Sequence, residues 1–178
     1  FEETERLVRA FVGLGIRRLR ITGGEPLLRR DLPQLLGRLS AIPGVEDVAL
    51  STNAFLLPDF APALRDAGVR RLNISLDTLR ADRFEDLTRF GSLDRVLLGL
   101  DAAAAAGFRN TKLNAVIIRG FNDDELPALV RFAAERELLL RFIEYMPIGV
   151  DGFWGDETFV STDEMIARLN PTHDVGPE

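Results

Sequence analysis

The sequence predicts an α/β fold in which parallel strands alternate with helices in a partial, open β/α barrel. Short β-favouring runs alternate with stretches of helical apolar spacing, at separations that suit βαβ crossovers. No linker-like stretch interrupts the 178 residues, so we expect a single domain over residues 1–178. Crossovers without an order reversal favour a barrel-like sheet, and five strands are too few to close one.

Helix and strand boundaries follow from capping residues, glycines and prolines. The opening residues form a helix that stops at Gly15, and a short helical segment surrounds Phe84. The expected helix starts, in chain order, are Asp31, Pro58 or Pro62, Ser92, Asn122 or Asp123, and a capping box of Ser161 with Glu164. The predicted strands span residues 16–22, 45–50, 69–76, 111–118 and 138–143.

Composition excludes several classes of function. The net charge of -6 argues against a nucleic-acid surface. No apolar run is long enough to span a bilayer and no signal-peptide pattern is present, so we expect a cytoplasmic protein without a membrane partner. Helix stripes that pack on a sheet resemble stripes that meet a partner chain, so the oligomeric state is not predicted. Lys112 is the only lysine, which suggests a position that needs a compact ammonium.

The first predicted strand ends in the turn Gly23-Gly24-Glu25-Pro26. The two glycines leave bare backbone amide and carbonyl groups for a ligand to approach. Pro26 stiffens the exit and restricts Glu25. Such a turn can also be a plain tight connection, so the motif alone does not establish a ligand site.

Polar residues gather where the predicted strands end, which is where parallel α/β folds bind their ligands. They are Thr22 to Glu25, Ser51 to Asn53, Ser75, Asp77, Asn114, and Glu144 to Met146.

Strand alternation sharpens this pattern, because it places Arg20, Asp77 and Lys112 on faces opposite the apolar residues. We expect a sheet face that holds a polar, partly anionic ligand. The alternative is that these charges form ion pairs that only stabilise the sheet.

The Gly-Gly-Glu segment resembles the motif with which radical S-adenosylmethionine enzymes hold the amino group of the methionine moiety. The longer run Arg20 to Asp31 (RITGGEPLLRRD) closely resembles one branch of that family, which acts on GTP in molybdenum cofactor biosynthesis. Matching motifs recur in order over nearly the whole chain. The resemblance implies the partial β/α barrel of that family, with its first βα unit before Phe1.

The resemblance also implies site residues, with no catalytic residue and no metal ligand assigned with certainty. The implied S-adenosylmethionine contacts are Gly24, Glu25, Ser75, Asn114, Arg141 and Met146. The implied GTP contacts are Arg20, Ser51 and Lys112. Two departures are visible: Ser51 stands where Thr is common in that family, and Ala54 stands where Gly is common.

The implied reaction converts GTP to 3′,8-cyclo-7,8-dihydro-GTP through a 5′-deoxyadenosyl radical, and the next enzyme of the molybdopterin pathway receives the product. The implied cofactors are S-adenosylmethionine and 4Fe-4S clusters held by cysteines. This chain has no cysteine, so we expect it to be inactive alone.

Three alternatives remain at this point. The first is another radical S-adenosylmethionine enzyme with a different substrate. The second is a cluster-less paralogue that binds nucleotides without catalysis. The third is an ordinary α/β-barrel lyase with Glu25, Asp77 and Lys112 in acid–base roles.

Overall fold

The computed structural model describes residues 1–89, 91–146, 155 and 157–170. The chain forms two compact units. The first contains Phe1–Ser75 and Asp94–Thr111, and the second contains Leu76–Leu93 and Lys112–Glu178. The expectation of one domain remains a prediction.

The first unit contains three parallel strands, β1 (Arg18–Ile21), β2 (Asp47–Thr52) and β3 (Arg71–Ser75). The predicted strands are confirmed, with ends that differ by a few residues. Arg20 lies opposite Ala49, and Ser51 lies opposite Asn73.

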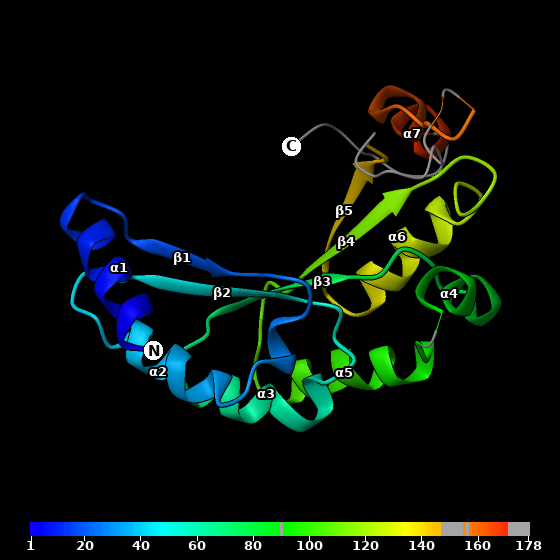
Figure 1. Cartoon of the computed structure of the whole chain (residues 1–178). Coiled ribbons are helices and arrows are strands. Elements are labelled where there is room, and N and C mark those ends of the chain that lie inside the picture. Colours follow the sequence, from blue (N-terminus) through cyan, green and yellow to red (C-terminus); the bar gives the residue numbers. More distant parts are fainter. Residues whose placement is uncertain (90, 147–154, 156, 171–178) are drawn as a thin grey trace. The chain divides into compact units, whose positions relative to one another are not determined.

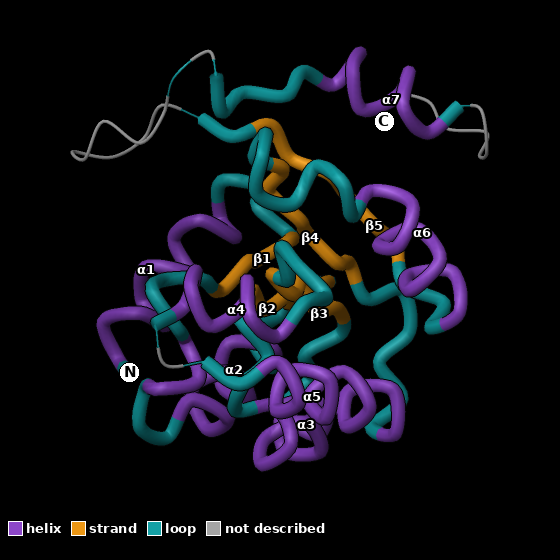
Figure 2. The backbone as a smooth tube through the Cα atoms, turned by 90° about the vertical axis from the view of Figure 1, so that its right-hand side faces the viewer, coloured by secondary structure: helices purple, strands orange, loops and turns teal. Residues whose placement is uncertain are grey.

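Helices α1 (Glu2–Gly13), α2 (Leu32–Ser40), α3 (Leu57–Asp66) and α5 (Leu93–Ala105) accompany these strands (Figures 1 and 2). Both views show α2, α3 and α5 together on one side of β1 and β2. A short 3₁₀ helix, η1 (Pro26–Leu28), follows β1. Apolar side chains of α2 and the strands are fully buried, among them Leu36, Leu39, Leu50, Leu72 and Ile74.

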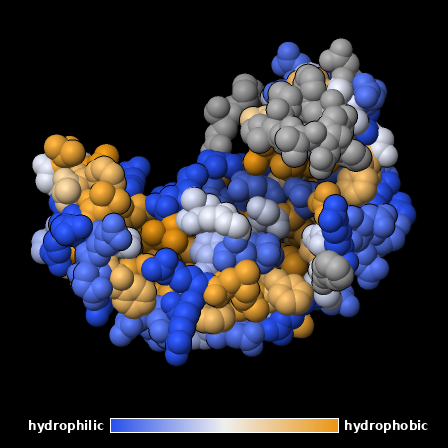
Figure 3. Space-filling model, viewed as in Figure 1, coloured by the Kyte–Doolittle hydropathy of each residue, from blue (hydrophilic) through white to orange (hydrophobic). Residues whose placement is uncertain are grey.

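Helix α1 buries a single residue. Its buried residue, Val8, packs with Leu35, Leu39 and Ile42. Apolar side chains also gather on the surface at the α1 end of the unit (Figure 3), and the large exposed ones in this region are Leu7, Phe11, Leu14 and Ile16.

The prediction that Asp31 caps a helix is right in position and wrong in the expected side-chain hydrogen bond. Asp31 occupies the N-cap position of α2, but its side chain makes no cap hydrogen bond. Its backbone is left-handed, with φ of 56°, and its carboxylate lies near the Arg30 guanidinium. Pro58 lies at the start of α3, as predicted, whereas Pro62 lies inside that helix.

The second unit contains the parallel strands β4 (Lys112–Ile117) and β5 (Leu139–Glu144), with helices α4 (Ala81–Thr88), α6 (Leu126–Glu135) and α7 (Thr162–Leu169). Helices α6 and α7 both contact β5. The core of the unit joins β4, α6 and α7 through the buried residues Ala115, Ile117, Leu126, Leu129, Val160, Met165 and Leu169. Each unit thus has parallel strands with accompanying helices, which confirms the α/β class.

One helix start in this unit was predicted wrongly and one is confirmed in part. Neither Asn122 nor Asp123 caps α6, whose N-cap position is Glu125 without a side-chain cap bond. Ser161 does cap α7, since its hydroxyl accepts a hydrogen bond from the Glu164 amide at 3.2 Å. The Glu164 carboxylate pairs with Arg119 and Arg168 instead of completing a capping box.

Within the described residues, no helix combines the length and apolarity that crossing a membrane requires. The same residues contain no cluster of three or more His, Cys, Asp or Glu side chains that could bind a metal ion.

Helix α5 approaches the loop after β2 so closely that Gly99 is required there. A Cβ at Gly99 would lie 2.2 Å from the Ala54 carbonyl oxygen, whereas a Cβ at Gly37 in α2 would meet nothing within 4 Å. We predict that Gly99→Ala lowers the free energy of unfolding by about 1–3 kcal/mol through overpacking. The control Gly37→Ala should raise it by up to about 1 kcal/mol, because alanine favours helix. Urea unfolding measures both, and equal effects of the two variants would contradict the packing described.

Candidate functional site

The turn after β1 is anchored by the Glu25 carboxylate. Glu25 Oε1 accepts hydrogen bonds from the Leu27 amide at 3.0 Å and from the Thr52 hydroxyl at 2.8 Å. Oε2 accepts one from the Asn53 amide at 2.8 Å. We call Glu25, Thr52 and Asn53 the Glu25 bridge, because it ties the turn after β1 to the end of β2.

The Glu25 bridge leaves the two glycines of the turn open. Gly23 and Gly24 are exposed, and a Cβ on either would meet no atom within 4 Å. Glu25 therefore fixes the position of the turn, while the backbone amide and carbonyl groups of the two glycines remain accessible to a ligand. Packing within the protein therefore does not require glycine at either position, and the role of the turn as a ligand site stays a prediction.

Thr52 also shapes the loop after β2. Its hydroxyl accepts a hydrogen bond from the Ala54 amide at 3.1 Å while it donates to Glu25. Ala54 is buried and left-handed, with φ of 64°. This is the conformation that glycine adopts without strain, so alanine keeps the turn at some conformational cost.

Side chains of the first unit separate into a packed face and a polar face, as alternation predicts. Arg20, Ser51 and Asn73 share the face opposite the buried Leu50, Leu72 and Ile74. Arg20 is exposed, Ser51 is half-buried and Ser75 is exposed at the last position of β3.

The second unit repeats this separation on β4 and β5. Asn114 lies opposite Arg141, and Lys112 lies on the same face. The Asn114 Oδ1 atom is buried and has no hydrogen-bond partner among the described residues. Asn114 lies inside β4, two residues from its start, and not at its carboxyl end as we expected.

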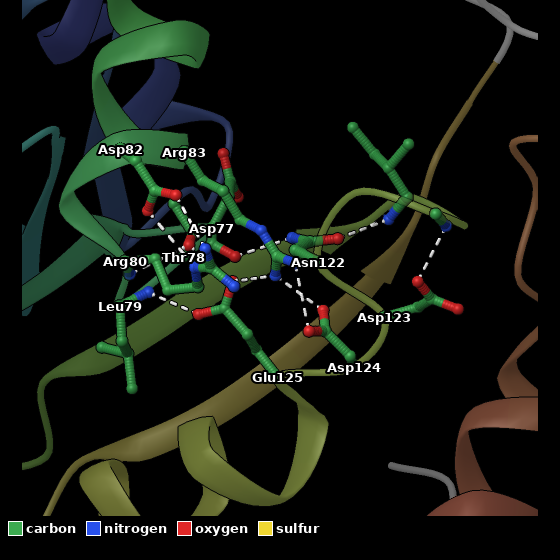
Figure 4. Close-up of polar contacts among 12 residues, drawn as sticks. Asp77, Thr78, Leu79, Arg80, Asp82, Arg83, Asn122, Asp123, Asp124 and Glu125 are labelled. Atoms are coloured by element: carbon green, nitrogen blue, oxygen red, sulfur yellow. Dashed lines mark hydrogen bonds and ion pairs between the residues drawn. The ribbon is translucent and has the colours of Figure 1, made fainter.

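The loop after β3 is held by a bridge of the same form as the Glu25 bridge (Figure 4). Glu125 Oε1 accepts a hydrogen bond from the Thr78 hydroxyl at 2.7 Å, and Oε2 accepts one from the Leu79 amide at 2.8 Å. The Thr78 hydroxyl accepts one from the Arg80 amide at 3.1 Å. We call Glu125, Thr78 and Leu79 the Glu125 bridge.

A charged side chain completes the Glu125 bridge. Arg83 donates to Glu125 at 2.7 Å and to Asp124 at 2.6 Å (Figure 4), which offsets the charge of the buried Glu125 carboxylate. Hydrogen bonding to Arg83 also lowers the pKa of Asp124.

Within the second unit, Asn122 and Asp77 connect the segment that begins at Leu76 to the end of β4. The Asn122 side-chain amide donates to the carbonyls of Asp77 and Val116 at 2.6 and 2.9 Å, and its oxygen accepts from the Ile118 amide at 2.7 Å. The Asp77 carboxylate accepts from the Val116 amide at 2.8 Å. Burial raises the pKa of Asp77, and the Val116 hydrogen bond acts in the opposite direction.

The ion-pair interpretation of the polar face is not supported for Arg20 and Asp77. Neither forms an ion pair among the described residues. Sequence reasoning missed Thr52, Thr78, Glu125 and Asn122 as loop-positioning residues. The only available signal was the repeated pairing of a glutamate in one βα loop with a threonine at the end of another strand.

The end of β5 is held by α7. The Glu144 carboxylate accepts hydrogen bonds from the Thr162 amide at 2.6 Å and hydroxyl at 2.8 Å. Met146 follows with its side chain exposed. The glycine-rich aromatic segment after it, which includes Phe153 and Trp154, lies outside the described residues.

The family model described as the radical SAM superfamily matches residues 1–133. The chain therefore belongs to the radical SAM superfamily. A relative from Pseudomonas putida, named GTP 3′,8-cyclase, is 53% identical over 169 residues, which are 94% of this chain and 51% of that protein. One of the same name from Pelotomaculum thermopropionicum is 48% identical over 174 residues, or 96% of this chain and 54% of that protein. The chain thus spans about half the length of these curated relatives.

Solved structures share the fold of this chain. Methylornithine synthase superposes with a TM-score of 0.72 at 16% identity, over 96% of this chain and 52% of that one. Streptococcus suis SuiB superposes with a TM-score of 0.71 at 21% identity, over 96% of this chain and 38% of that one. At these identities the likeness shows the fold alone, and it confirms the predicted fold class.

The residues present fit one family cofactor and not the other. In the first unit, the open Gly23-Gly24 backbone offers acceptors that suit the ammonium of S-adenosylmethionine. In the second unit, the buried Asn114 oxygen is an acceptor that suits a hydroxyl donor. Iron–sulfur clusters need cysteine thiolates, and these 178 residues contain none.

The attachment of α7 depends on two carboxylates, and we predict that acid weakens it. Hydrogen bonds from Arg119 lower the pKa of Glu164 to about 2, and those from Thr162 lower the pKa of Glu144. A lowered folded-state pKa gives stability that is present above the unfolded value and lost as pH falls through the folded one. The contribution should therefore disappear between pH 4.5 and about 2.

Urea unfolding from pH 7 to pH 2.5 measures this dependence. The double variant Glu144→Gln/Glu164→Gln should show a flatter decline than the wild type. Glu135→Gln, which changes an exposed carboxylate on α6, is the control. A double variant with the wild-type slope would contradict the prediction.

Proposed function

We propose that this chain is the central part of a GTP 3′,8-cyclase that acts in the cytoplasm in molybdenum cofactor biosynthesis. The supporting observation is the 48–53% identity, over nearly the whole chain, to proteins of that name. The other radical SAM alternative keeps the same cofactor site and differs in substrate. Membership of the radical SAM superfamily argues against the alternative of an ordinary α/β-barrel lyase.

In this proposal the turn after β1 binds the methionine moiety of S-adenosylmethionine. Its ammonium needs hydrogen-bond acceptors, and the exposed Gly23-Gly24 backbone offers carbonyl oxygens. The Glu25 carboxylate adds a negative charge, and among the described residues its Oε2 accepts a hydrogen bond only from the Asn53 amide. Ser75, Asn114, Arg141 and Met146 are the further proposed contacts.

GTP is the proposed substrate, with Arg20, Ser51 and Lys112 as its contacts. Arg20 is an exposed cation on the polar face of the first unit. Arginine and lysine bind phosphate or base oxygens through charge-assisted hydrogen bonds, and the Ser51 hydroxyl can orient a sugar or base. We assign no acid–base role to the side chains of this chain.

S-adenosylmethionine, when bound in a complete radical SAM enzyme, supplies the radical that takes hydrogen from the substrate. The task of the residues in this chain is to bind and orient the cofactor and GTP and to exclude water. The product is proposed to pass to the next enzyme of the pathway, and the chain by itself to be inactive.

The proposal is tested with the full-length protein, by calorimetric titration with GTP and by following GTP consumption under reducing conditions. Lys112→Ala should weaken GTP binding by about 10–100-fold, since a hydrogen bond to a charged group contributes about 1.5–3 kcal/mol. Lys112→Arg should recover part of the affinity. Arg131→Ala removes an exposed positive charge from α6 and should leave GTP binding unchanged.

Two outcomes would contradict the proposal. One is a Lys112→Ala protein that binds GTP as tightly as the Arg131→Ala protein, which removes the assigned contact. The other is cleavage of S-adenosylmethionine without consumption of GTP, which favours a radical SAM enzyme with another substrate.

A further inference from the structure

A polar pocket lies in the first unit, at the amino ends of its strands. Its volume is about 620 Å³, and it opens to solvent. Asp47 and Arg71, the first residues of β2 and β3, form part of its wall. The rest comes from the connections that follow α3 and α5, with the full lining being Asp47, Arg65, Gly68, Val69, Arg70, Arg71, Gly107, Arg109 and Asn110.

The pocket carries a net positive charge in a chain whose net charge is -6. Arg71 forms a bidentate ion pair with Asp47, so these two charges cancel. Three arginines remain, Arg65, Arg70 and Arg109.

Of these three arginine side chains, Arg65 contacts neighbouring groups of the protein. Arg65 lies in the last turn of α3, donates to the Val69 carbonyl at 3.4 Å and stacks over the Phe108 ring. Arg70 and Arg109 are exposed and form no ion pair among the described residues. Two guanidinium groups are therefore available in a pocket that a third makes more positive.

The walls of the pocket are fixed by backbone geometry. Gly68 has φ of +87°, and a Cβ there would lie 2.8 Å from the Ser40 side chain. Gly107 and Asn110 are also left-handed, with φ of 81° and 56°. These conformations set the path of both connections, so the pocket does not need a ligand to form.

The pocket is distinct from the Gly23-Gly24 turn. The turn follows the carboxyl end of β1, whereas Asp47 and Arg71 begin β2 and β3. The strands are parallel, and β2 with six residues is about 20 Å long at about 3.3 Å per residue. The two sites therefore lie at opposite ends of this sheet.

We propose that this arginine pocket binds a small ligand through a phosphate or polyphosphate group. Guanidinium groups match phosphate oxygens in bidentate geometry, and three cations suit a polyanion better than a single carboxylate. The volume lies within the range of about 300–1,000 Å³ for small-molecule sites. A free polyphosphate and the phosphate chain of a nucleotide share this chemistry.

The test titrates the full-length protein with inorganic tripolyphosphate and with ATP in low salt. It uses Lys112→Ala as the background, so that the proposed GTP contact is weakened and the two proposals fail separately. Arg70→Ala/Arg109→Ala should lower the affinity for both ligands by tenfold or more, and Arg70→Ala/Arg109→Glu should lower it further. The control Arg6→Ala/Arg131→Ala removes two exposed charges elsewhere and should change the affinity by less than about twofold.

Equal affinities for tripolyphosphate and ATP would identify the phosphate chain as the whole ligand, and tighter binding of ATP would assign a nucleotide. The proposal is overturned if neither ligand binds saturably. It is equally overturned if the pocket variants bind as tightly as the charge-matched control. Raising the salt concentration should weaken binding in the wild-type pocket, because the contacts are exposed charges.

Discussion

The Glu25 carboxylate is the constraint on which the loops at the carboxyl ends of β1 and β2 depend. It accepts three hydrogen bonds, two of them from the end of β2. It therefore joins the loop after β1 to the loop after β2. A flexible Gly-Gly turn loses much conformational entropy when a ligand orders it. Because Glu25, the residue after the two glycines, is already fixed, this loss would be smaller if the turn binds S-adenosylmethionine as proposed.

The Glu125 bridge applies the same solution in the second unit. In both bridges one carboxylate oxygen accepts from a threonine hydroxyl, the other accepts from the next backbone amide, and the threonine oxygen caps the amide two residues on. Loops at strand ends expose many backbone amides, and a carboxylate satisfies several of them at once. The two bridges differ in charge, because among the described residues Glu125 also contacts an arginine and Glu25 does not.

The sequence predicted all five strands and the main helices, because apolar periodicity and glycine stops are local signals. It also located the Gly23–Glu25 turn and the polar strand faces. It did not predict the capping of α2 and α6, because Asp31 takes a left-handed backbone and Asn122 is used between strand ends. Nor did it predict the partners of Glu25 and Glu125, which lie 27 and 47 residues away and are set by tertiary structure.

The central claim is that Thr52 and Glu25 hold the turn that we propose binds S-adenosylmethionine. The most direct test measures the affinity of the full-length protein for this cofactor in two matched variants, Thr52→Val and Thr78→Val. Each removes one buried threonine hydroxyl that donates to a bridging glutamate, so each should lose about 1–3 kcal/mol of stability. We predict that Thr52→Val loses about tenfold or more in affinity, since about 1.4 kcal/mol corresponds to tenfold, and that Thr78→Val loses clearly less. Equal affinities in two variants of equal stability would contradict the account.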